Sequence, residues 1–429
     1  MSTAAVVVAP PAAGTGEKRA LDGAWMLSLS TAVSGGLAYA FHVLAARSLG
    51  SADYGRIAVL WAAMFLLVVV LFRPLEQTTS RAVADRLARG DRARGVMRSV
   101  LALYLGIVAV LIVVVAVAWA PITNGIFLGD DVLTGALVAG VAGYGLAYVL
   151  RGLLSGSGWF EGYGLLLLAD SGIRLLAAAP LVAVASSDVA AVAVAVAGIG
   201  GAVVPAFVGR KRLRALVERP EGSRFHVRGA LAFAAPVTVI AAADQVLING
   251  GPILVVLGGG SAKTAGIVFA ATMLVRVPVY LFQGLAASLL PNLTRLSAHD
   301  DVLFRRGVIR TAAVLFGLGV GAIVGAAVVG PAALGILYGD EFSAERLDLT
   351  LLGVGVAFYL VAATVSQALL ALAAVRSAAV AWSASAIVFL LLYVALQGGE
   401  LFRISAALAV ATALGAISLV VVLALRLRR

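Results

Sequence analysis

The residues with the clearest chemical potential in this chain are charged side chains inside long apolar stretches. The segment FRPLEQTTSRAVADRLARG (72–90) follows directly on the apolar run AVLWAAMFLLVVVL, and it opens with Arg73, Glu76 and Gln77. These three residues and Ser80 are spaced i, i+3, i+4 and i+7, so they share one face of a helix. A guanidinium inside hydrocarbon is costly unless it has a partner or faces a hydrated space. The spacing therefore predicts a polar face on this helix, which must find partners or face a wet cavity.

Other apolar stretches carry similar groups. Asp170 and Arg174 are four residues apart in LLLADSGIRLL, so they can pair on one helix. Arg73 and Arg276 have no acidic residue four positions away in either direction, which favours a role in a cavity. The candidate residues for substrate binding are Arg73, Glu76, Gln77, Arg174, Arg276 and Gln283, and the candidates for ion coupling are Asp170 and Asp244.

Two interpretations of these groups stay open. In one, they pair with each other and hold helices together. In the other, they line a wet cavity that accepts an anionic headgroup, because the planar guanidinium of arginine donates two parallel hydrogen bonds to phosphate. An aspartate there can carry a coupling proton or sodium ion. The chain has no cysteine and only His42, His226 and His299, far apart, so we expect no metal, cofactor or catalytic triad.

The composition places these residues in a membrane protein. Hydrophobic residues make up 62% of the 429 residues and charged residues only 12%, with a mean hydropathy of +1.06. Soluble domains are roughly half apolar and a quarter charged. Apolar runs of about 20 residues recur along the chain, long enough to cross a bilayer as helices. Transmembrane β-strands are only about half as long, so the pattern excludes a barrel.

We therefore predict an all-α polytopic membrane protein with about twelve transmembrane helices. Most of the 32 Lys and Arg residues fall in loops on one side, notably within 81–98 and 210–228. Such an excess marks the cytoplasmic side, so both termini are expected there, in a plasma-membrane protein. The arginines lie in separate loops without interleaved aromatic residues, which argues against nucleic acid. The predicted spans are 25–46, 57–80, 99–121, 132–154, 163–185, 188–208, 229–257, 264–291, 308–330, 349–373, 377–397 and 403–425.

The spans divide into two sets of six. Residues 1–22 are expected to form a mobile cytoplasmic tail, 23–208 an N-terminal six-helix bundle, 209–228 a basic linker and 229–429 a C-terminal six-helix bundle. The two halves resemble each other weakly: 49–72 is similar to 257–282. Two related bundles with a site between them are a recurrent transporter architecture.

Three motifs resemble a known family. AARSLGSADYGRIA (45–58) is similar to the LAR-LG-x-x-x-YG turn of the oligosaccharide and polysaccharide flippases of the multidrug/oligosaccharidyl-lipid/polysaccharide (MOP) exporter superfamily. FRPLEQTTSRAVA (72–84) and VRVPVYLFQGLAASLLPNLTRLSA (275–298) resemble the ends of that family's second and eighth spans. The resemblance implies a MATE-like, V-shaped pair of six-helix bundles around a central cavity.

The resemblance also implies a function. Such flippases move polyprenyl-diphosphate-linked oligosaccharides, precursors of cell-envelope polysaccharide, from the inner to the outer leaflet without enzymatic chemistry. By position, the residues that would contact the diphosphate are Arg73 and Arg276, with Arg174 as the third candidate. The partners it implies are this lipid-linked substrate, membrane lipids and polysaccharide-assembly enzymes, with proton or sodium coupling left open. The first span has His42 but no Arg-Asp pair, which separates the chain from the peptidoglycan-precursor flippases.

Three alternatives remain. A major-facilitator-type carrier also has six plus six spans, and ADRLARGDR (84–92) faintly resembles its loop between spans two and three, without the expected glycines. A multidrug or cation antiporter of the same superfamily would favour acidic groups in the cavity. In this chain, arginines outnumber acidic residues among the charged residues inside the spans. A non-transport scaffold or a polymerase-type membrane enzyme is disfavoured by the short loops expected on the exterior.

Overall fold

The structure is a computed structural model, and it describes residues 15–90, 93–217, 227–279, 301–372 and 374–427. These residues form helices joined by short turns, with no β-strand among them. Helices are expected because every backbone N–H and C=O within hydrocarbon must be satisfied inside the protein. The fold class predicted from the apolar runs is thus confirmed.

The helices in the first half of the chain lie close to the positions of the predicted spans. One of them starts at a side chain that satisfies free backbone N–H groups: Asp130 accepts hydrogen bonds from the N–H groups of Val132 and Leu133. The elements are α1 (Thr15–Ala88), α2 (Arg94–Val117), α3 (Trp119–Gly125), α4 (Asp131–Gly156), α5 (Phe160–Ala177), the 3₁₀ turn η1 (Ala179–Val182), α6 (Ser187–Val208) and α7 (Arg210–Val217).

The second half continues with another set of long helices. Ser261 caps the short helix that begins at Ala262 by accepting a hydrogen bond from the N–H of Thr264. The elements are α8 (Val227–Leu257), α9 (Ala262–Val275), α11 (Asp301–Tyr338), α12 (Arg346–Ala371), α13 (Val375–Ala395) and α14 (Glu400–Leu427).

Ten helices within the described residues are long and apolar enough to span a membrane. One of them, α1, holds the first two predicted spans, because its two parts meet at Gly50, whose φ of 72° is not helical. The predicted span 264–291 begins as α9 and runs on into residues outside the described part of the chain. Of the remaining predicted spans, 99–121 runs from α2 into α3 and 163–185 runs from α5 into η1, and the others each fall on one helix.

The structure differs from the sequence-based boundaries at two places. Helix α1 already begins at Thr15, inside the segment 1–22 that we expected to be a tail. Within the expected linker 209–228, α7 is helical and α8 starts at Val227. The many arginines of α7 are compatible with a helix because arginine has high helix propensity.

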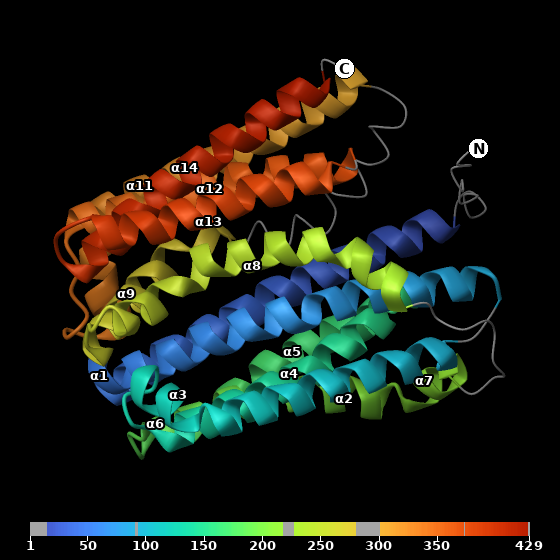
Figure 1. Cartoon of the computed structure of the whole chain (residues 1–429), viewed down its shortest axis with the longest axis horizontal. Helices are drawn as coiled ribbons and strands as arrows, with labels where there is room; N and C mark the ends of the chain where they lie inside the picture. The colour runs from blue at the N-terminus through green and yellow to red at the C-terminus, as the bar shows by residue number, and fades with distance from the viewer. Residues whose placement is uncertain (1–14, 91–92, 218–226, 280–300, 373, 428–429) are drawn as a thin grey trace.

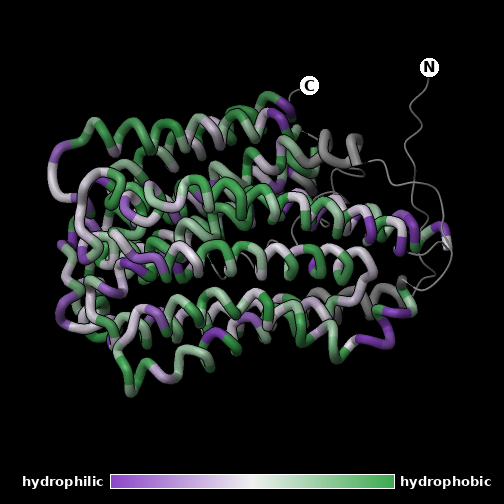
Figure 2. The backbone as a smooth tube through the Cα atoms, turned by 60° about the horizontal axis from the view of Figure 1, so that its bottom comes forward, coloured by the Kyte–Doolittle hydropathy of each residue, from purple (hydrophilic) through white to green (hydrophobic). Residues whose placement is uncertain are grey.

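The long helices lie roughly side by side along one axis (Figure 1). Helices α1, α2, α4, α5 and α6 contact one another and form what we term the first helix group; α8, α9 and α11 to α14 form the second helix group. The start of α1 and the end of α14 lie at one end of the molecule, termed the terminal end (Figure 1). Hydrophobic residues run along the helices, and hydrophilic residues concentrate at the two ends (Figure 2).

Helix α1 of the first group packs on both α8 and α9 of the second, and at the opposite end it comes very close to α9. A Cβ added to Gly55 would collide with the carbonyl oxygen of Ala262, and one added to Gly266 would collide with that of Ser51. Small residues permit this close approach of helices in a membrane protein. Gly55 and Gly266 come from the two segments, 49–72 and 257–282, whose sequences resemble each other.

Candidate functional site

Part of the first helix group presents a polar surface towards the second. Arg73 on α1 is an exposed side chain, although it stands far inside the long helix. One turn further along, Glu76 accepts a 2.8 Å hydrogen bond from the hydroxyl of Tyr163 on α5. On α4, the guanidinium of Arg151 lies 4.7 Å from the ring centre of Tyr148 and 6.0 Å from that of Tyr163. Two arginines and two tyrosines thus surround one carboxylate.

The second helix group carries a chain of hydrogen bonds. Asp244 on α8 accepts a 2.6 Å bond from the hydroxyl of Tyr359 on α12 and a 3.1 Å bond from the amide of Gln245. Asn249 donates to Gln245 at 2.7 Å. Arg276, which follows the last residue of α9, donates to the carbonyl oxygen of Ile248 and the side-chain oxygen of Asn249. Arg276 is 8% exposed, and both of these acceptors are neutral oxygens.

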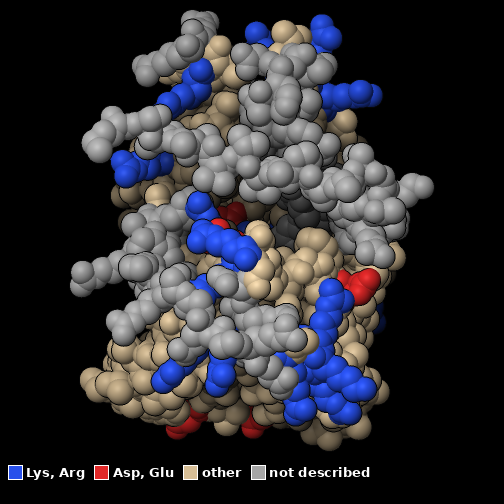
Figure 3. Space-filling model, turned by 90° about the vertical axis from the view of Figure 1, so that its right-hand side faces the viewer, with Lys and Arg blue, Asp and Glu red and all other residues tan. Residues whose placement is uncertain are grey.

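The two surfaces face each other. Arg73 interacts electrostatically with Glu76, Tyr148 and Tyr163 of its own group and also with Asp244 of the other. Arg73 is thus an exposed side chain with titratable groups of both helix groups nearby. The face of the molecule at the terminal end is hollowed near its centre, and Lys and Arg side chains gather on that face (Figure 3). We take these two surfaces together as the candidate site.

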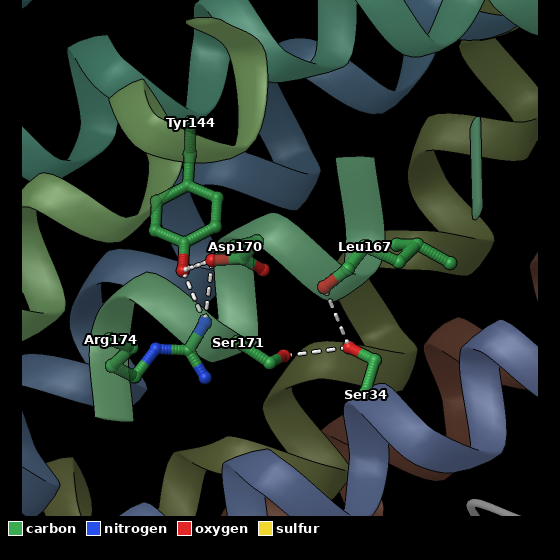
Figure 4. A network of polar contacts seen from close by, with 6 residues as sticks. All are labelled: Ser34, Tyr144, Leu167, Asp170, Ser171 and Arg174. Carbon is green, nitrogen blue, oxygen red and sulfur yellow. Dashed lines mark hydrogen bonds and ion pairs between the residues drawn. The ribbon is translucent and has the colours of Figure 1, made fainter. Parts of the chain in front are cut away.

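A second polar cluster lies inside the first helix group (Figure 4). Asp170 and Arg174 on α5 form a 2.7 Å ion pair, as their i, i+4 spacing predicted, and Arg174 is only 2% exposed. The hydroxyl of Tyr144 donates to Asp170 and accepts from Arg174. Ser34 of α1 bonds to Ser171 of α5 at 2.6 Å. The guanidinium of Arg174 also lies 4.7 Å from the ring centre of Trp61, which ties the cluster to α1.

At the opposite end, polar contacts join the two groups. Gly50 interrupts the helical backbone, so the N–H of Ser51 is free at the start of the second part of α1, a position that attracts anions. Glu341, in the turn between α11 and α12, accepts hydrogen bonds from this N–H at 2.9 Å and from the Ser51 hydroxyl at 2.7 Å. Arg47 donates to the carbonyl oxygens of Ile336 and Leu337. These bonds hold the two groups together at that end.

The contact between Glu341 and Ser51 is expected to depend on pH. The two hydrogen bonds from Ser51 hold the pKa of Glu341 below its usual value of 4.5. A group with a lowered pKa stabilises the contact at every pH above the usual value, and this stabilisation is lost as the pH falls through the lowered pKa. Nitroxide labels on Ala52→Cys and Asp340→Cys should show dipolar broadening that decreases below about pH 4. Ser51→Ala should shift this change to higher pH, and an identical midpoint in both proteins would contradict the assignment.

Aromatic side chains fill the space beneath this contact. His42 of α1 is fully buried and its Nδ1 lies 3.3 Å from the hydroxyl of Tyr54. Its ring stacks edge-on against Trp61, also of α1, and against Phe269 of α9. The histidine thus lies in a packed layer between the groups. Among the described residues no cluster of His, Cys, Asp and Glu has an arrangement that would hold a metal ion.

The predicted site residues therefore fall into different places. Arg73, Glu76, Asp244 and Arg276 belong to the candidate site, whereas Asp170 and Arg174 form the cluster of Figure 4. Gln77 is half-buried on α1, next to Glu76. Gln283 lies outside the described residues. The site also contains residues that the sequence analysis did not select: Tyr148, Arg151, Tyr163, Gln245, Asn249 and Tyr359.

Sequence comparison finds relatives in mycobacteria. An uncharacterized protein of Mycobacterium bovis, Mb3654, is 29% identical over 363 residues, which cover 82% of this chain and 79% of the relative. Rv1510, an uncharacterized protein of Mycobacterium tuberculosis, is 26% identical over 360 residues, 82% of this chain and 78% of its own length. No protein-family model matches the chain.

Solved structures with the same fold are transporters. A multidrug resistance MATE family transporter of the MOP superfamily in an inward-facing conformation superposes with a TM-score of 0.74 at 14% identity, covering 94% of this chain and 98% of that one. An outward-facing conformation of such a transporter gives a TM-score of 0.72 at 14% identity, covering 98% and 99%. The chain is a multi-pass membrane protein with the MATE-like fold of this superfamily.

Proposed function

We propose that this protein is a flippase that moves a polyprenyl-diphosphate-linked oligosaccharide from the inner to the outer leaflet of the plasma membrane by alternating access. The observation that carries the proposal is Arg73, an exposed arginine with acidic residues of both helix groups nearby. With Arg151 and Arg276 close to the same surfaces, the site offers several donors suited to phosphate oxygens. The polyprenyl tail would stay in lipid while the charged headgroup crosses through the hydrated space.

The charge distribution supports the proposed orientation in the membrane. Lys and Arg side chains gather at the terminal end, which supports placing both chain ends in the cytoplasm (Figure 3). The contacts of Ser51 and Glu341 would then close the site on the outer side. Of the two candidate coupling groups, Asp244 is the better placed, because it faces the site, whereas Asp170 is held by Arg174 and Tyr144.

A multidrug or cation antiporter is the second candidate, favoured by Asp244 and by the transporters that share the fold. Reconstitution in proteoliposomes separates the two functions. A fluorescent polyprenyl-diphosphate oligosaccharide should become accessible to a membrane-impermeant quencher faster with the protein than without it, and tetraphenylphosphonium should not accumulate under a proton or sodium gradient. The reverse result would replace the flippase proposal by the antiporter.

A further inference from the structure

A separate pocket opens near the opposite end, within the second helix group. Its volume is about 440 Å³, and it lies between the start of α9, the start of α12 and the start of α14. This volume is in the range of small-molecule binding sites. The pocket takes no part in the candidate site described above, since it contains none of the residues that face Arg73.

The walls of the pocket are acidic on one side and apolar on the other. Asp348, Glu345 and Glu400 supply three carboxylates, and no Lys or Arg lines the pocket. Glu400 is paired with Arg403 at 2.8 Å and accepts a bond from Tyr393, so its charge is largely compensated. The apolar part is formed by Ile267, Leu401 and Phe402.

Asp348 is the observation that points to a ligand. It is only 7% exposed, it lines the pocket, and the nearby Glu345 carries a charge of the same sign. Its carboxylate has no hydrogen-bond or ion-pair partner in the part of the chain that the structure describes. The start of α12 stabilises a negative charge only modestly. A buried carboxylate without a partner is costly, and a cation in the pocket would remove that cost.

We propose that this pocket binds a small organic cation, an ammonium group attached to an apolar or aromatic body. The ammonium would lie against Asp348 and Glu345, and the apolar body against Phe402 and Leu401. A metal ion fits less well, because among the described residues no three carboxylate or histidine groups converge in a metal-binding arrangement. The proposal does not depend on which substrate crosses the membrane.

Binding of radiolabelled 2-phenylethylamine to the full-length purified protein tests the proposal. We expect saturable binding that unlabelled amine displaces and that the uncharged 2-phenylethanol does not. Asp348→Asn should lower the affinity at least tenfold, and Glu345→Gln, which alters an exposed side chain, should lower it several-fold. Asp188→Asn is the matched control, since Asp188 is an exposed acidic residue in the first turn of α6, outside the pocket.

Four results would overturn the proposal. These are absence of saturable binding to the wild-type protein, equal competition by 2-phenylethanol, displacement of the amine by sodium or calcium ions at matched concentration, and full affinity in a folded Asp348→Asn protein. If Asp348→Asn does not yield a monodisperse protein, full affinity in Glu345→Gln has the same consequence.

Discussion

Replacing Arg73 with alanine is expected to lower the initial rate of lipid-linked oligosaccharide flipping by about tenfold to a hundredfold. A hydrogen bond to a charged group contributes roughly 1.5–3 kcal/mol, and about 1.4 kcal/mol corresponds to a factor of ten. Arg73 is an exposed arginine with acidic residues of both helix groups nearby, so under the proposed function its loss would remove a phosphate donor in the path of the headgroup. The rate is measured by fluorescence quenching in proteoliposomes with matched protein content.

Two further variants separate charge from geometry. Arg73→Lys keeps the positive charge but loses the planar pair of donors, so its rate should lie between those of the wild type and Arg73→Ala. Arg89→Ala is the control, because Arg89 follows the end of α1, is exposed and pairs with Asp85 in the last turn of that helix. Such a surface pair contributes about 0–1 kcal/mol to stability. Wild-type flipping by a folded Arg73→Ala protein would show that Arg73 does not bind the headgroup.

The sequence predicted most of the fold because apolar length alone identifies membrane helices. It also located the turn AARSLGSADYGRIA, and the structure gives physical reasons for several of its residues. Gly50 adopts a positive φ, Ser51 bonds to Glu341, and Gly55 allows α1 to approach α9. The sequence indicated a turn between two spans but not that the two helical parts of α1 would meet at a single residue. A kink of this kind needs only one non-helical backbone position, here Gly50, and one residue leaves no pattern in the sequence.

Part of the candidate site was also accessible from the sequence. Arg73 and Arg276 were selected because they have no carboxylate four residues away, and Arg151 meets the same criterion. Applying it to every arginine within a span would have added Arg151. Tyr163 and Tyr359 carried no such signal, since a tyrosine in an apolar helix is ordinary and only the assembled bundle brings it to Glu76 or Asp244.

Residue spacing along the sequence predicted the ion pair within α5, but it did not predict contacts between groups on separate helices. Residues four apart on a helix are neighbours whatever the rest of the fold does, so Asp170 and Arg174 could be paired in advance. The contributions of Tyr144 from α4 and Trp61 from α1 depend on how three helices pack, which no local pattern encodes. The depth of burial of Arg174 is likewise a property of the bundle.

Asp170→Ala is expected to destabilise the protein by about 3–5 kcal/mol, the usual effect of removing one partner from a buried ion pair. Arg174 would remain buried with a single hydroxyl, that of Tyr144, in place of its counter-ion. Unfolding of the purified protein in mixed micelles with increasing denaturing detergent measures the change in free energy. Asp85→Ala, which breaks the exposed pair with Arg89, should change it by less than about 1 kcal/mol.

The double variant Asp170→Leu, Arg174→Met distinguishes a structural pair from a transport group. It replaces both charges with apolar side chains of comparable size, and buried ion pairs replaced in this way often lose no stability. We expect it to recover most of the stability that Asp170→Ala loses. If the pair only holds α5 to its neighbours, the double variant should also flip substrate at a near wild-type rate. A stable double variant that no longer responds to a proton or sodium gradient would instead assign ion coupling to Asp170.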